Sequence, residues 1–104
     1  MANYRIDLSL PAENDLRDIL HYIATQLLEP QTALEMLNFI EAEVNTLSFM
    51  PQRQPLIRDK RLAKLGYRLL PVKNYLVFYS INEEEQMVNI ERILYKRRNW
   101  HHLL

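Results

Sequence analysis

Apolar residues recur at helical spacing through the first half of the chain. Residues 4–8 come before them and alternate between polar and apolar, which predicts a short strand. Ser9 and Pro11 are typical of a helix start, and Pro30 can open a second helix at its first turn. Two apolar seams follow these starts: Leu16, Ile19, Leu20, Ile23 and Leu27, then Ala33, Leu37, Ile40, Val44 and Leu47. The short connection between them predicts an antiparallel helical hairpin.

The second half of the chain changes to strand patterns. We expect strands over residues 67–72, 74–81 and 87–95, and a basic loop over residues 51–64. The middle strand is apolar on both parities, which is typical of a central strand covered on both faces. The order β-α-α-β-β-β predicts a single α+β domain over residues 1–104. Its N-terminal helical hairpin packs on an antiparallel sheet.

Arg92 interrupts the apolar parity of the last predicted strand. Val88, Ile90 and Leu94 share its parity, so a regular strand would place this cation among core residues. A β-bulge would reverse that parity and is the alternative. A cation placed only for solubility would not need such a position, and we therefore count Arg92 as a candidate binding residue.

The composition indicates the cellular compartment and excludes some classes of site. The chain of 104 residues has no cysteine, which excludes disulfides and thiolate metal sites and favours a reducing compartment. No apolar run is long enough for a membrane span, and the N-terminus lacks the apolar stretch of a signal peptide. We expect a cytoplasmic protein without a membrane partner.

The net charge of zero conceals opposite net charges in the two halves of the sequence. Residues 1–50 hold two cations and eight anions, whereas residues 51–104 hold eleven cations and five anions. The halves therefore carry −6 and +6. One explanation for this separation of charge is that acidic residues on helices and basic residues on edge strands keep the protein soluble. The alternative is a basic side that faces an anionic partner.

The sequence lacks the residue patterns that most kinds of catalytic site require. The only histidines are His21, His101 and His102, and their spacing is not that of a metal site. A single glycine excludes a phosphate-cradling loop, and no serine lies in a nucleophile elbow. We expect no metal and no cofactor.

The basic residues near the C-terminus are the remaining candidates for function. Arginine forks bind phosphates, aromatic rings stack on bases, and histidine moves protons near neutral pH. The candidates for contact with a target or partner are Arg92, Lys96, Arg97, Arg98 and Trp100. The alternative is that Trp100 and the leucines after it only dock the tail onto the core.

The chain resembles the RelE/ParE family of toxins from bacterial type II toxin–antitoxin systems. The resemblance is carried by residues 9–16 and 19–23, then by residues 66–72, 74–79 and 93–100. The C-terminal run is closer to the ParE and plasmid-stabilisation branch. The resemblance implies a growth inhibitor that a cognate antitoxin neutralises by wrapping across the helices and the sheet.

Two targets follow from the resemblance. ParE-like members inhibit DNA gyrase, whereas RelE-like members cut mRNA on the ribosome. In the nucleases, cations at positions like Arg68 and Arg97 hold the phosphate, and His101 or His102 would have to supply the acid or base. Leu76 stands where the nucleases commonly carry an arginine, and the chain lacks their terminal tyrosine. We therefore predict a gyrase inhibitor. An endoribonuclease is the first alternative, and a non-toxic antitoxin-binding module is the second.

Overall fold

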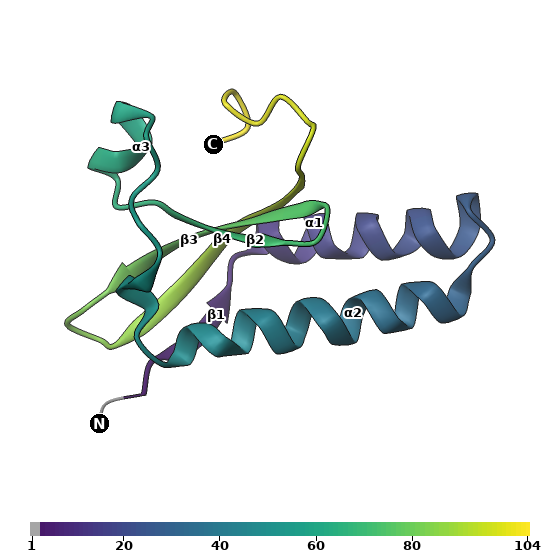
Figure 1. Cartoon of the computed structure of the whole chain (residues 1–104), viewed down its shortest axis with the longest axis horizontal. Coiled ribbons are helices and arrows are strands. Elements are labelled where there is room, and N and C mark those ends of the chain that lie inside the picture. The colour runs from purple at the N-terminus through teal and green to yellow at the C-terminus, as the bar shows by residue number, and fades with distance from the viewer. Residues whose placement is uncertain (1–2) are drawn as a thin grey trace.

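A helical hairpin and a four-stranded sheet form the body of the domain (Figure 1). The computed structural model describes residues 3–104. The hairpin consists of α1 (Leu10–His21), which continues as a π-helical turn over Tyr22–Gln26, and α2 (Pro30–Asn45). The strands are β1 (Arg5–Leu8), β2 (Arg68–Val72), β3 (Tyr75–Asn82) and β4 (Met87–Tyr95). The predicted α+β class and the predicted helical hairpin are confirmed.

Both helices of the hairpin begin at residues that favour a helix start. The Ser9 hydroxyl accepts a hydrogen bond from the backbone N–H of Ala12 at 3.1 Å and caps α1. Pro30 occupies the first turn of α2, where no backbone N–H is needed. Between the helices, Leu28 has a φ of 53°, a left-handed conformation that costs a leucine about 1–2 kcal/mol. The exposed fraction of Leu28 is 81%.

The strand order is β1-β4-β3-β2, so β3 and β4 are central. The three C-terminal strands pair in antiparallel fashion as predicted, but β1 lies parallel to β4, with Arg5 opposite Met87 and Leu8 opposite Ile90. This parallel pair makes the sheet mixed. Its direction follows from long-range packing, because β1 must lead directly into a helix that packs beside β4.

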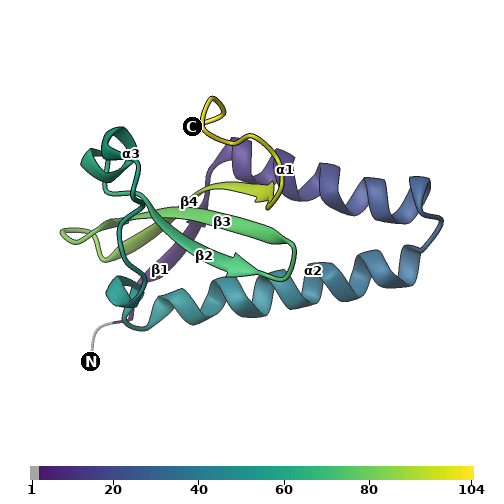
Figure 2. The same cartoon turned by 45° about the horizontal axis from the view of Figure 1, so that its top comes forward.

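Both faces of the sheet are covered (Figure 2). We call the side under α1 and α2 the helix face and the opposite side the tail face. Val77 and Tyr79 of β3 belong to the core on the helix face, whereas Leu76 and Phe78 belong to a smaller cluster on the tail face. The prediction that β3 is covered on both faces is confirmed.

A short helix and the C-terminal tail close the tail face. Helix α3 (Lys60–Lys64) lies within the segment predicted to be a loop. The Asp59 carboxylate caps α3 by accepting from the Leu62 N–H at 3.1 Å, and Leu62 itself is fully buried. The helix was missed because a single turn is too short for a periodic signal.

A β-bulge between β3 and β4 decides which way Arg92 points. Phe78 pairs with Arg92 and Tyr79 pairs with Ile90, so Glu91 is the extra residue. Ile90 therefore packs on the helix face, whereas Arg92 shares the tail face with Phe78. The bulge alternative is confirmed, and Arg92 does not lie among the residues of the main core.

Candidate functional site

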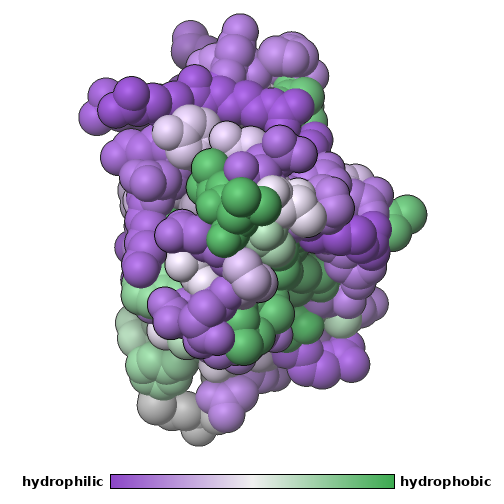
Figure 3. Space-filling model, turned by 90° about the vertical axis from the view of Figure 1, so that its right-hand side faces the viewer, coloured by the Kyte–Doolittle hydropathy of each residue, from purple (hydrophilic) through white to green (hydrophobic). Residues whose placement is uncertain are grey.

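A groove lies where α1 meets the ends of β3 and β4. Its volume is about 560 Å³, and we call it the α1 groove. The helical side contributes Asp15, Asp18, Ile19, Tyr22, Ile23 and Leu27, and the sheet side contributes Tyr75, Ile93, Tyr95 and Arg98. Figure 3 shows apolar side chains gathered in the middle of the face that contains the hairpin tip, with polar residues around them.

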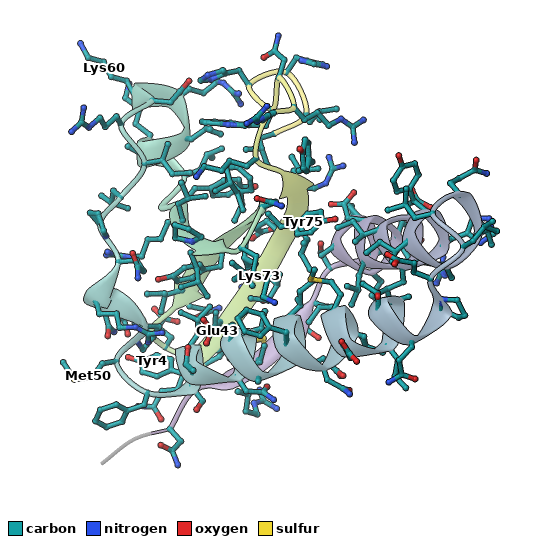
Figure 4. The ribbon with its side chains drawn as sticks, turned by 45° about the vertical axis from the view of Figure 1, so that its right-hand side comes forward. Tyr4, Glu43, Met50, Lys60, Lys73 and Tyr75 are labelled. Carbon is teal, nitrogen blue, oxygen red and sulfur yellow. The ribbon has the colours of Figure 1, made fainter. Side chains whose placement is uncertain are left out.

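Tyrosines form much of the groove wall. The rings of Tyr75 and Tyr95 meet edge to face with centroids 5.9 Å apart. Burial raises the pKa of Tyr75, and negative charge on Tyr95 or Tyr22 would raise it further. All three side chains line the groove. Tyr75 lies where the end of the sheet meets the hairpin (Figure 4). Partly exposed tyrosines in an apolar recess are typical anchors of a protein interface.

The charges in the groove lie on opposite sides. Asp18 is exposed on α1, and Arg98 is exposed after β4. Neither forms an ion pair within residues 3–104, where Arg92 pairs with Asp15 and the His101 ring lies 3.6 Å from the Asp59 carboxylate. A segment bound in the groove can therefore pair a cation with Asp18 and an anion with Arg98.

Arg92 and Asp15 connect the groove to the tail. Arg92 Nε and Nη2 donate to the two carboxylate oxygens of Asp15 at 2.7 and 2.8 Å, and Nη1 donates to the Leu103 carbonyl at 2.8 Å. The backbone N–H of Ile93 also donates to Asp15, at 2.9 Å. The hydrogen bond with Asp15 raises the pKa of Arg92. Because all three guanidinium nitrogens already donate, Arg92 joins α1, β4 and the tail, and its predicted contact with a partner stays a prediction.

The tail docks on the sheet through Trp100. The Trp100 ring lies 5.1 Å from the Phe78 ring, and Leu103 and Leu104 pack on the same cluster. The His101 ring stacks on Trp100 at 4.0 Å, and its Nδ1 lies 3.6 Å from the Asp59 carboxylate. The docking role considered for Trp100 is thus what the structure shows, and a binding role for it remains a prediction.

No grouping of ligands for a metal ion is present in residues 3–104. Over the same residues, no helix combines the length and the apolar character needed to cross a bilayer.

The sequence profile described as ParE toxin of type II toxin–antitoxin system, parDE, matches residues 6–100. The chain belongs to the ParE toxin family. The match covers both the hairpin and the sheet, and the predicted RelE/ParE resemblance is confirmed. No curated protein matches the chain in sequence.

Solved structures of toxin–antitoxin complexes have a similar fold. One is the chromosomal ParDE system from P. aeruginosa, with a TM-score of 0.70, 20% identity, and coverage of 88% of this chain and 95% of that one. Another is the RelBE2 complex from Mycobacterium tuberculosis, with a TM-score of 0.63, 21% identity, and coverage of 94% and 97%. At this identity they support the RelE/ParE-like fold.

This ParE-family chain does not bring the predicted nuclease residues together. Arg68 pairs with Tyr79 on the helix face, and its guanidinium donates to the carbonyls of Gln52 and Gln54. Arg97 follows the end of β4, which lies opposite Tyr75. Arg68 and the end of β4 are therefore separated by the length of β3 from Tyr79 to Tyr75, which is about 13 Å.

The other nuclease positions lie on the tail side of the ParE-family fold. Leu76 is buried in the cluster under the tail, with an exposed fraction of 7%. His101 is stacked on Trp100, and His102 is exposed in the tail. These side chains, together with Arg68 and Arg97, are spread over both faces of the sheet and do not converge on one point.

Apart from Arg98, the groove residues of this ParE-family chain were not among the candidates from the sequence. Tyr22, Tyr75 and Tyr95 belong to three elements that are far apart along the chain. Tyr22 is an aromatic residue beside the first helical seam, and in the structure its side chain is 56% exposed. Which tyrosines share a recess depends on how the hairpin lies on the sheet.

Proposed function

We propose that this ParE-family protein inhibits bacterial growth by acting on DNA gyrase. The observation that carries the choice of gyrase over mRNA is the position of Leu76, which the tail buries where a nuclease would expose a cation. A scissile phosphate needs several cations and a proton donor around one point. The separation of Arg68, Arg97 and the tail histidines argues against that arrangement.

We further propose that a cognate antitoxin inserts a segment into the α1 groove. The groove offers tyrosine rings and aliphatic floor residues as anchors, with Asp18 and Arg98 as opposite charges at its edges. Leu28 supports this role, because it stays exposed in a left-handed conformation next to Leu27, a lining residue. Strained and exposed residues are kept more often for contact than for stability. The segment should carry apolar anchors, a cation toward Asp18, and an anion toward Arg98.

The target is tested by two assays on the chain expressed alone. Purified protein is added to gyrase and a relaxed plasmid, and in parallel to translating ribosomes with a defined mRNA. We expect loss of supercoiling and intact mRNA. Cleavage of mRNA that disappears in both Arg68→Ala and Arg97→Ala would replace gyrase with the nuclease alternative. A chain that affects neither system yet still binds the antitoxin would be the non-toxic binding module.

The groove is tested with the protein encoded by the adjacent gene as the binding probe. Tyr22→Asp puts a charge on an exposed groove residue, and Leu10→Asp puts the same charge on an exposed residue of α1 outside the groove. We expect Tyr22→Asp to weaken binding at least about 10-fold by calorimetry, since desolvating an added carboxylate is costly. Leu10→Asp should bind like the wild type. Equal affinities for the two variants would rule out the groove as the docking site.

A further inference from the structure

A set of exposed cations lies on and just before α3 and on the segment that follows β4, outside the α1 groove except at Arg98. We call it the basic rim, and it comprises Arg58, Lys60, Lys64, Lys96, Arg97 and Arg98. Residues 58–64 and 96–98 together hold seven of the 13 cations and one of the 13 anions, which is +6; the rest of the chain therefore carries −6. The positive charge of the second half is thus concentrated in two short segments.

Tertiary contacts hold these two segments on the same side of the sheet. Arg61 of α3 donates from Nη1 to the Leu104 carbonyl at 2.9 Å and from Nη2 to the His101 carbonyl at 3.0 Å. At the other end of the tail, the Lys96 N–H donates to the Asn74 carbonyl at 2.7 Å. The tail is therefore fastened at both ends, and the rim is a fixed surface. Lys60 extends away from the body of the domain (Figure 4).

The rim cations are exposed and have no carboxylate partner within residues 3–104. Asp59 is the one anion among them, and it caps α3 and faces His101. Holding so many like charges together is electrostatically unfavourable, and no ion pair among the described residues 3–104 compensates for it. By contrast Arg53 caps α2, Arg68 holds backbone carbonyls and Arg92 is paired. Within these two basic segments Arg61 holds the tail, and the six rim cations remain exposed for contact with an external anion.

The surroundings of the rim fit a phosphate backbone better than an acidic protein. The hollow beside it is lined by Asn74, Tyr95, Lys96 and Arg97 and offers little apolar surface. The apolar residues of the tail face inward, onto the cluster with Phe78. A protein partner usually needs apolar anchors at the centre of its interface, whereas a phosphodiester backbone needs mainly exposed lysine and arginine. Arginine forks also match phosphate geometry.

We propose that the basic rim binds the phosphate backbone of duplex DNA without reading its sequence. The inference rests on the proposed function only in choosing duplex DNA over RNA, because gyrase holds a DNA duplex. A toxin bound to gyrase through other surfaces would then contact the DNA beside it through the rim. This contact would add to the affinity for the gyrase–DNA complex, and it predicts that inhibition weakens as the salt concentration rises.

The test is binding of a fluorescent mixed-sequence duplex of about 20 base pairs, measured by anisotropy over a salt series without gyrase or antitoxin. For the wild type we expect the logarithm of the association constant to fall linearly with the logarithm of the salt concentration. The double variant Arg97→Gln/Arg98→Gln should reduce the slope of that line by the amount expected for the loss of about two phosphate contacts. Arg5→Gln/Arg17→Gln removes the same charge from exposed positions away from the rim and should leave the slope unchanged.

Four results would overturn the proposal. They are absence of duplex binding at low salt, an equal loss in both double variants, tighter binding of a single-stranded RNA, and displacement of the duplex by a polyglutamate peptide at a lower concentration than unlabelled duplex. The last would assign the rim to an acidic protein. Duplex binding without any effect on supercoiling would leave the rim assignment standing and refute the choice of gyrase. Gyrase inhibition without duplex binding would refute the rim assignment and leave the choice of gyrase standing.

Discussion

Removing the buried Asp15 carboxylate should strongly destabilise the protein. Asp15 is 9% exposed and accepts hydrogen bonds from Arg92 Nε, Arg92 Nη2 and the Ile93 N–H at 2.7–2.9 Å. In Asp15→Ala, the guanidinium loses its counter-ion and a buried backbone N–H loses its acceptor. The tail also depends on this arginine, because Arg92 Nη1 holds the Leu103 carbonyl.

The magnitude follows from the burial of the groups left behind. Truncating one partner of a buried ion pair costs about 3–5 kcal/mol. The Arg92 side chain is 20% exposed, so water recovers part of its solvation and the lower end applies. The Ile93 N–H adds a desolvation cost of about 1 kcal/mol or more. We therefore expect Asp15→Ala to lower the free energy of unfolding by about 3–4 kcal/mol. In a chain of this length that corresponds to a fall in Tm of at least about 12 °C.

The assay is chemical denaturation followed by circular dichroism, with Asp18→Ala as the matched control. Asp18 lies one turn further along α1, is exposed, and lacks an ion-pair partner within residues 3–104. Its truncation should change the free energy of unfolding by less than about 0.5 kcal/mol. Arg92→Met and the double variant Asp15→Ala/Arg92→Met complete a double-mutant cycle.

The cycle decides whether the reasoning holds. Replacing both charges leaves no uncompensated ion, so the double variant should be more stable than the sum of the single changes predicts, by about 2 kcal/mol. Additive single changes, or a cost below about 1 kcal/mol for Asp15→Ala, would show that the pair is solvated in solution and does not hold the tail.

Three further predictions follow from the fold. Trp100→Ala should destabilise the protein by about 2 kcal/mol and bring Phe78 within reach of solvent, which protease sensitivity of the tail would report, whereas unchanged protection would count against a docked tail. Leu28→Gly should raise Tm by a few degrees, worth about 0.5–1 kcal/mol, because glycine adopts the left-handed conformation without strain; a lower Tm would contradict this. The Leu62 N–H lowers the pKa of Asp59 below its usual 3.8, so the stability it adds is present above about pH 4 and is lost as pH falls through the lowered value. The difference in Tm between wild type and Asp59→Ala should therefore shrink as pH falls below about 4, and a difference that grew over that range would refute the assignment.

Local signals explain why the secondary structure was largely predictable. The caps at Ser9 and Pro30 and the seams that follow them act within one or two turns, so the hairpin could be located without any tertiary information. The double-sided apolar pattern of residues 74–81 correctly indicated a central strand. Helix α3 escaped prediction, because its capping by Asp59 and the burial of Leu62 give no periodic pattern over five residues.

The candidate site was much less predictable, because its members meet only through packing. The basic segments were visible as charge in the sequence, but the Arg61 contacts that join them were not. Likewise nothing in the pattern showed that Tyr22, Tyr75 and Tyr95 share a groove. The expected nuclease set relied on positions inferred from the family, and the structure places Arg68 and Arg97 apart.

Sequence patterns alone predicted the α+β class, the order of the two long helices and the four strands, the resemblance to ParE toxins, and the separation of charge between the two halves. The class, the order of these elements and the charge separation depend on periodicity, capping and composition, which act over short stretches of chain. The family relationship rests instead on the resemblance of particular residues to known toxins. Tertiary structure decided that β1 runs parallel to β4 and that the bulge at Glu91 turns Arg92 to the tail face. It also decided that the tail buries Leu76 and that two basic segments form one rim. These outcomes depend on register and on contacts between distant segments, where a shift of one residue moves a side chain to the opposite face.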